Sequence, residues 1–80
     1  MEKTKKYKTA IEDYTRSIRL NPAYAAAYNN RGAAKSKLKD YSGAADDFKK
    51  TLQIKPGDKD AMINLQNINS SQIKVGNMIY

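Results

Sequence analysis

Apolar and small residues recur every three to four positions in four stretches of the chain, and polar residues fill the positions between them. This spacing places the apolar residues on one side of a helix and the polar residues on the other. The pattern predicts helices over residues 8–20, 23–38, 42–54 and 59–71. We therefore expect an all-α fold of about four helices.

Short breaks separate the predicted helices. Asn21-Pro22 ends the first helix, because the residue before a proline avoids the helical conformation. Ser42 is expected to cap the third helix, and Asp58, at the end of a Pro-Gly turn, the fourth. The final residues, 73–80, are partly apolar but are interrupted by Gly76-Asn77, so we expect them to form a tail.

A segment of the chain, residues 7–24, recurs 34 positions later as residues 41–58. The matching positions are apolar, small or proline residues, whereas the exposed positions differ between the copies. A fixed period of this length is typical of a solenoid, in which each unit buries its apolar face against its neighbour. The repeat therefore indicates a packing unit and not a catalytic loop.

The positions that define the repeat form a recognisable motif. They are Tyr7, Ala10, Tyr14 and Pro22 in the first copy, and Tyr28, Gly32, Tyr41, Ala44, Phe48 and Pro56 within residues 25–58. In type and spacing they resemble the tetratricopeptide repeat, whose unit of 34 residues folds as two antiparallel helices, A and B. The resemblance implies an antiparallel helix-turn-helix solenoid in which Gly32 and Ala44 are small because helices A and B approach closely there.

The resemblance also implies a division of the single domain, residues 1–80. Residues 5–24 form helix B of a partial repeat, residues 25–58 a complete repeat, residues 59–72 a terminal A or capping helix, and residues 73–80 a tail. The first helix then lacks an A helix to pack against. We expect the apolar tail or a second copy to cover this face, or the chain to be part of a longer solenoid.

Four residues differ from the family pattern. Arg31 stands where leucine is usual, Lys35 where an aromatic residue is usual, Thr51 where alanine is usual and Gln66 where glycine is usual. Since glutamine leaves less room than glycine, we expect no second helix to pack closely on the fourth helix, which then acts as a cap with one polar face.

Composition narrows the chemistry. The chain has neither cysteine nor histidine, which excludes disulfides, thiolate metal sites and the commonest general base. Asp13 and Asp47 recur with the repeat, which we interpret as a solvated helix face, and the adjacent pairs Glu12-Asp13 and Asp46-Asp47 point apart on a helix. We expect no catalysis, no cofactor and no metal.

The resemblance implies a protein-interaction module that binds a peptide or helix in a concave groove lined by A helices. Transferred to this sequence, the groove residues are Asn29, Asn30, Ala33, Lys37, Asn64 and Asn67. Asn30 and Asn64 are 34 positions apart and can form a ladder that hydrogen-bonds a peptide backbone, although they can equally be solvated. A clamp for a terminal carboxylate is not expected, because Asn29, Asp60 and Asn64 stand where it needs basic residues.

Net charge leaves two alternatives open. The chain carries +7, and ten of its 15 Lys and Arg residues lie within residues 1–40. Such a basic half can bind nucleic acid non-specifically, with Tyr7 and Tyr41 available for stacking, although the repeat favours packing roles for both. The other alternative is a homodimer formed by exchange of helices at the exposed face of the first helix. We see no signal peptide and no membrane span, and so favour a cytoplasmic location.

Overall fold

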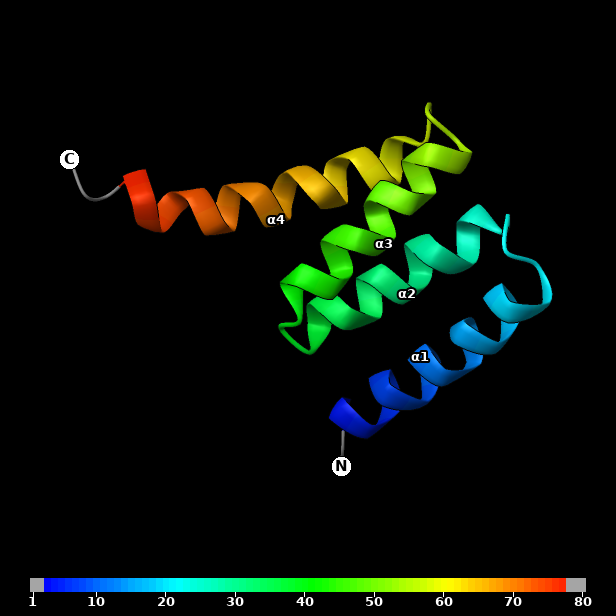
Figure 1. The fold of residues 1–80 in the computed structure, drawn as a ribbon. Coiled ribbons are helices and arrows are strands. Elements are labelled where there is room, and N and C mark those ends of the chain that lie inside the picture. The colour runs from blue at the N-terminus through cyan, green and yellow to red at the C-terminus, as the bar shows by residue number, and fades with distance from the viewer. Residues whose placement is uncertain (1–2, 78–80) are drawn as a thin grey trace.

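The computed structural model describes residues 3–77, with side chains for residues 4–69, and contains four α-helices in this range (Figure 1). They are α1 (Lys3–Leu20), α2 (Ala25–Lys37), α3 (Tyr41–Ile54) and α4 (Lys59–Asn77). Each helix packs against its neighbour in the sequence, and α4 also contacts α2. The all-α prediction is confirmed, and the hairpin of α2 and α3 forms the centre of the fold.

The observed helix ends differ from the predicted ones mainly at the outer helices. α1 begins five residues earlier than predicted, at Lys3, and α4 continues through Gly76 to Asn77. Residues 73–77 therefore extend α4, and residues 78–80 lie outside the described range. Within residues 3–77, α4 makes no contact with α1, and Figure 1 shows its C-terminal half running away from the other helices. This part of the tail does not cover the first helix, contrary to the first of our expectations for that face.

Two aspartates cap the later helices. The Oδ1 atom of Asp40 accepts a hydrogen bond of 3.0 Å from the backbone N–H of Gly43, so Asp40 caps α3 and the prediction of Ser42 is wrong. The Oδ1 atom of Asp58 accepts a bond of 2.9 Å from the N–H of Ala61, which confirms Asp58 as the cap of α4. Each cap satisfies a backbone donor that a helix start leaves free.

The turn between α2 and α3 places a lysine in the left-handed region. Lys39 has φ 66°, and its N–H donates to the carbonyl of Ser36 over 2.9 Å. The next N–H, of Asp40, donates to the carbonyl of Lys35, also over 2.9 Å. These two hydrogen bonds form a Schellman motif, in which the residue in the left-handed conformation is usually glycine. The motif folds the chain back directly and brings α3 against α2.

The core lies between the helices and includes four of the ten motif residues, Tyr28, Gly32, Ala44 and Phe48. Its buried apolar residues are Ala27, Tyr28, Ala34, Ala44, Phe48, Ala61 and Ile68. A Cβ atom placed on Gly32 would lie 2.7 Å from Cε1 of Phe48, so the expected close approach of α2 and α3 is confirmed at Gly32. Met62 of α4 lies outside the core and is 44% exposed.

The remaining motif residues are less buried. Tyr7, Ala10 and Tyr14 are half-buried on α1, whereas Pro22, Tyr41 and Pro56 are exposed. Both prolines lie in the turns that follow α1 and α3, where they end the helix and fill no core position. Within the described range, no helix combines the length and the apolar composition that a bilayer crossing requires.

Candidate functional site

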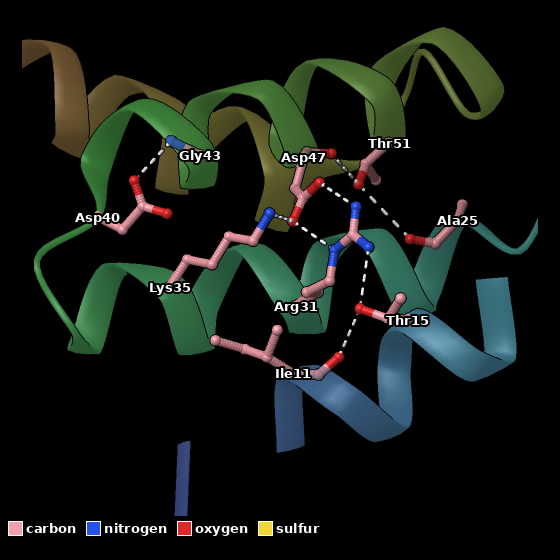
Figure 2. A network of polar contacts seen from close by, with 9 residues as sticks. All are labelled: Ile11, Thr15, Ala25, Arg31, Lys35, Asp40, Gly43, Asp47 and Thr51. Carbon is pink, nitrogen blue, oxygen red and sulfur yellow. Dashed lines mark hydrogen bonds and ion pairs between the residues drawn. The ribbon is translucent and has the colours of Figure 1, made fainter. Parts of the chain in front are cut away.

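A buried ion pair joins α2 to α3 at the centre of the molecule (Figure 2). The Nε and Nη2 atoms of Arg31 donate to the two carboxylate oxygens of Asp47 over 2.8 and 2.7 Å. The side chains of Arg31 and Asp47 are only 17% and 6% exposed. This two-pronged geometry is the strongest that an arginine and a carboxylate can form. It also raises the pKa of Arg31 above its ordinary value, although burial opposes the shift.

Three further side chains complete this network. The Nζ atom of Lys35, one turn after Arg31, lies 3.2 Å from Oδ2 of Asp47. On the other side, Nη1 of Arg31 donates to the Thr15 hydroxyl of α1 over 3.2 Å, so the arginine links three helices. The Thr51 hydroxyl donates to the carbonyl of Asp47 over 2.9 Å. No buried polar side-chain atom within residues 4–69 lacks a partner, so the network is fully satisfied.

The interpretation of Asp47 as part of a solvated helix face is therefore wrong. Asp47 is 4% exposed as a residue, because α2 lies directly over it, whereas its repeat equivalent Asp13 is exposed. The signal in the sequence was the pair of basic departures at Arg31 and Lys35. They are four residues apart on one helix face, at positions that are otherwise apolar, and buried cations require an acidic partner. Two of the four departures from the family pattern, Arg31 and Lys35, thus meet at one carboxylate, and a third, Thr51, donates to the backbone carbonyl of the same residue.

The acidic residues of the described range do not gather into a metal-binding cluster. Asp46 is exposed and Asp47 is buried against Arg31, so these adjacent carboxylates diverge. On α1, the exposed Asp13 accepts a bond of 3.5 Å from Arg16 of the same helix. Within the described residues, no three acidic side chains come together to hold a metal ion.

A hollow of about 220 Å³ opens between α2, α3 and α4, and we call it the α2–α4 hollow. Its lining residues are Ala33, Ser36, Lys37, Tyr41, Phe48, Asn64, Asn67 and Ile68. Four of the six predicted groove residues are among them. Phe48 and Ile68 belong to the core and provide an apolar floor, whereas the asparagines and Lys37 provide hydrogen-bonding groups at the rim.

The other two predicted groove residues lie elsewhere. Asn29 does not line the hollow, but its Oδ1 atom accepts a bond of 3.5 Å from Nδ2 of Asn64. Asn30 lines a second hollow, of about 290 Å³, between α1 and α2. This α1–α2 hollow is lined by Lys6, Tyr7, Ala10, Tyr14, Asn30, Ala33, Ala34 and Lys37. Asn30 and Asn64 thus occupy neighbouring hollows, which meet at Ala33 and Lys37.

Both hollows are basic. Lys37 lines both of them and Lys6 lines one, whereas no aspartate or glutamate lines either. The nearby Lys35 is held by Asp47 and contributes less free charge. An acidic group that enters either hollow therefore meets an attractive field without competition from a neighbouring carboxylate.

Comparison with known proteins agrees with the repeat geometry. A family model for the tetratricopeptide repeat matches residues 25–58, and a second model of the same family matches residues 3–39. RNA polymerase II-associated protein 3 of Xenopus tropicalis is 43% identical over 65 residues, which are 81% of this chain and 10% of that protein.

Two further relatives show the same partial coverage. Serine/threonine-protein phosphatase 5 of Homo sapiens is 34% identical over 84% of this chain and 13% of its own length. Heat shock protein STI1 of Saccharomyces cerevisiae is 31% identical over 85% of this chain and 12% of its own length. The chain thus spans roughly a tenth of these relatives. The two family matches and the observed helical hairpins establish that the chain belongs to the tetratricopeptide repeat family.

Proposed function

We propose that the chain is a non-catalytic interaction module that binds a segment of another protein in the α2–α4 hollow. The observation that supports this proposal is the lining of the hollow, where Asn64, Asn67 and Lys37 surround an apolar floor. Amide groups supply both donors and acceptors to a polypeptide backbone, and the floor can accept an apolar side chain. Because the hollow lies between packed helices, it is formed before the ligand arrives, which reduces the entropy lost on binding.

The relatives support the general part of this proposal, binding of another protein, and not the use of a particular hollow. One of them is named for its association with RNA polymerase II, and another is named as a heat shock protein. Since the chain corresponds to about a tenth of each, their activities and partners are not transferred to it. What we carry over is the class of function, binding of another protein.

Selection from a random peptide library tests the proposal without knowledge of the natural partner. We expect the intact chain to enrich peptides that perturb the NMR signals of Asn64 and Asn67. Asn64→Ala and Asn67→Ala should lose these peptides while their melting temperatures stay close to that of the parent. Asn30→Ala serves as the matched control, because Asn30 lines only the neighbouring hollow.

Two results would contradict the proposal that the α2–α4 hollow binds a segment of another protein. One is the absence of any enriched sequence, and the other is enrichment that both groove variants retain. Fluorescence anisotropy with a single-stranded oligonucleotide addresses the nucleic-acid alternative. Binding that is released by salt and does not depend on Asn64 or Asn67 would move the function to the basic residues.

A further inference from the structure

Two stripes of residues border the α2–α4 hollow. On α2 the stripe consists of Asn29, Ala33 and Lys37, and on α4 it includes Ile63 and Asn67. The members of each stripe are four residues apart, so they lie on one face of their helix. The two stripes are also equivalent in the repeat, because Ile63 and Asn67 follow Asn29 and Ala33 by 34 positions.

The two stripes lie side by side. Nδ2 of Asn64, the residue after Ile63, donates to Oδ1 of Asn29 over 3.5 Å. One helical turn further along, Ala33 and Asn67 line the same hollow. The two stripes, Asn64 and the hollow together form a surface that we call the α2–α4 groove. It is built from α2, α3 and α4 and includes no residue of α1.

The chemistry of this groove changes along its length. At one end Ile63 is 54% exposed, which is unusual for a large apolar side chain. One turn further on, the buried side chains of Phe48 and Ile68 form the floor of the hollow. At the other end lies the exposed Lys37. The groove therefore presents an apolar surface, an apolar depression and a cation, in that order.

The spacing of these three features matches an extended chain. Successive positions of a stripe are four helical residues apart, which corresponds to a rise of about 6 Å. Side chains on one side of an extended chain recur every second residue, at about 6.6 Å. The two spacings agree to within about 1 Å. Alternate side chains of an extended segment thus meet Ile63, the hollow and Lys37 in turn.

A helical ligand has a similar spacing but fits the groove less well. The hollow, of about 220 Å³, is smaller than the range of about 300–1,000 Å³ that is common for ligand pockets, and a helix is about 10 Å wide. The bond between Asn29 and Asn64 also closes the groove at one end of the hollow. A helix satisfies its own backbone groups, whereas the amides of Asn64 and Asn67 can pair with the free backbone groups of an extended segment.

The charges at the two ends of the groove differ. Asp60 lies in the first turn of α4, beyond the Ile63 end. At the opposite end, Lys37 lines the hollow, and no aspartate or glutamate is among the lining residues. An acidic side chain of the ligand is therefore attracted at the Lys37 end and repelled at the Ile63 end.

We propose that the segment of another protein bound in the α2–α4 groove is extended and carries two apolar side chains and one acidic side chain at alternate positions. This inference rests on the proposed function, because it names the ligand chemistry of the same hollow. The first apolar side chain contacts Ile63, the second fills the hollow, and the acidic side chain pairs with Lys37. This order runs along the groove and holds for either direction of the bound chain.

The test uses the intact chain and a labelled synthetic peptide with the order leucine, serine, leucine, serine, glutamate. The peptide is flanked by glycine and serine, is blocked at both ends so that no terminal charge contributes, and is also made in the reverse order. We expect one of the two peptides to perturb the NMR signals of Ile63, Asn64 and Asn67. Exchange of the glutamate with its neighbouring serine should weaken binding about tenfold in an anisotropy titration, because the carboxylate then points away from Lys37.

Variants of the protein test each contact separately. Ile63→Ser should weaken binding about fivefold. Met62→Ser is the matched control, because Met62 is also exposed but lies about 100° around α4. Lys37→Glu should prefer a peptide in which lysine replaces the glutamate. N-methylation of the peptide backbone between the two leucines should also weaken binding about fivefold, since it removes a hydrogen-bond donor.

A helical peptide distinguishes the two ligand conformations. It is rich in alanine and carries the two leucines and the glutamate four residues apart, on one face. Tighter binding of this peptide than of the extended one would overturn the proposal, as would equal losses in Ile63→Ser and Met62→Ser.

The library selection separates this inference from the proposed function. Selected peptides that depend on Asn64 and Asn67 but lack the alternating order would overturn the inference and leave the proposed function intact. If neither the selected nor the designed peptides bind, the proposed function itself is wrong.

Discussion

Arg31 and Asp47 are bound by two hydrogen bonds of 2.8 and 2.7 Å across the interface of α2 and α3, in a position where an apolar contact is usual for the family. The pair is nearly inaccessible to solvent, and Lys35 and Thr15 occupy its remaining hydrogen-bonding positions. Burial of two charges costs free energy that their attraction offsets only when the geometry is good. We therefore interpret this pair as one that specifies how α2 and α3 fit together more than it adds to stability.

This interpretation predicts opposite results for single and double substitution. Arg31→Leu should lower the free energy of unfolding by about 3 kcal/mol, because Asp47 stays buried with only Lys35 as a charged partner. Combining Arg31→Leu with Asp47→Leu should recover most of that loss, since two apolar side chains can fill the space. Urea denaturation measures both. A double variant as unstable as the single one would show that the pair itself supplies the stability.

Gly32 should not tolerate even one methyl group. We expect Gly32→Ala to destabilise the protein by about 1–3 kcal/mol, because its Cβ would lie 2.7 Å from Phe48. The control is Gly57→Ala, since a Cβ there meets nothing within 4 Å. Phe48→Leu should reduce the penalty at Gly32 if the clash is the cause. Thermal unfolding of the three variants measures these effects. Equal melting temperatures for Gly32→Ala and Gly57→Ala would contradict the predicted clash with Phe48.

Lys39 offers a stabilising substitution. Its φ of 66° is accessible to glycine without the steric cost that a side chain brings. We expect Lys39→Gly to raise the free energy of unfolding by about 0.5–1 kcal/mol, a fraction of the usual left-handed penalty. Lys55→Gly is the control, because Lys55 ends α3 with φ −133°. There, glycine should destabilise by increasing the freedom of the unfolded chain. If both glycine substitutions stabilised the protein, the cause would be the removal of a positive charge and not the backbone conformation of Lys39.

Lys37 should govern the charge preference of the binding surface, because it lines both hollows. We expect peptides selected by the intact chain to be acidic, and their affinity for Lys37→Glu to fall about tenfold at low ionic strength. The loss should shrink as salt rises, since screening weakens the attraction. Lys55→Glu carries the same charge change outside both hollows and should bind as the parent does. Equal losses of affinity in both variants would indicate that the overall charge of the protein attracts the peptide, and not a local contact with Lys37.

The sequence by itself determined the number of helices, the repeat and much of the core. These follow from local rules, because apolar spacing sets a helix face and the period of 34 places equivalent faces in register. The close approach of two helices at Gly32 could be predicted in advance for this reason, whereas the structure identified Phe48 as the side chain that Gly32 meets. The helix caps were harder, since both Asp40 and Ser42 are chemically able to cap α3 and only the path of the turn selects Asp40.

Only the tertiary structure decided the roles of the charged and amide residues. Asp13 and Asp47 are equivalent in the sequence, yet one is exposed and the other is buried, because α2 covers α3 and no described helix covers the same face of α1. Asn30 and Asn64 are likewise equivalent but line separate hollows. A repeat specifies what each position can contact, whereas burial and pairing depend on which neighbour lies over it.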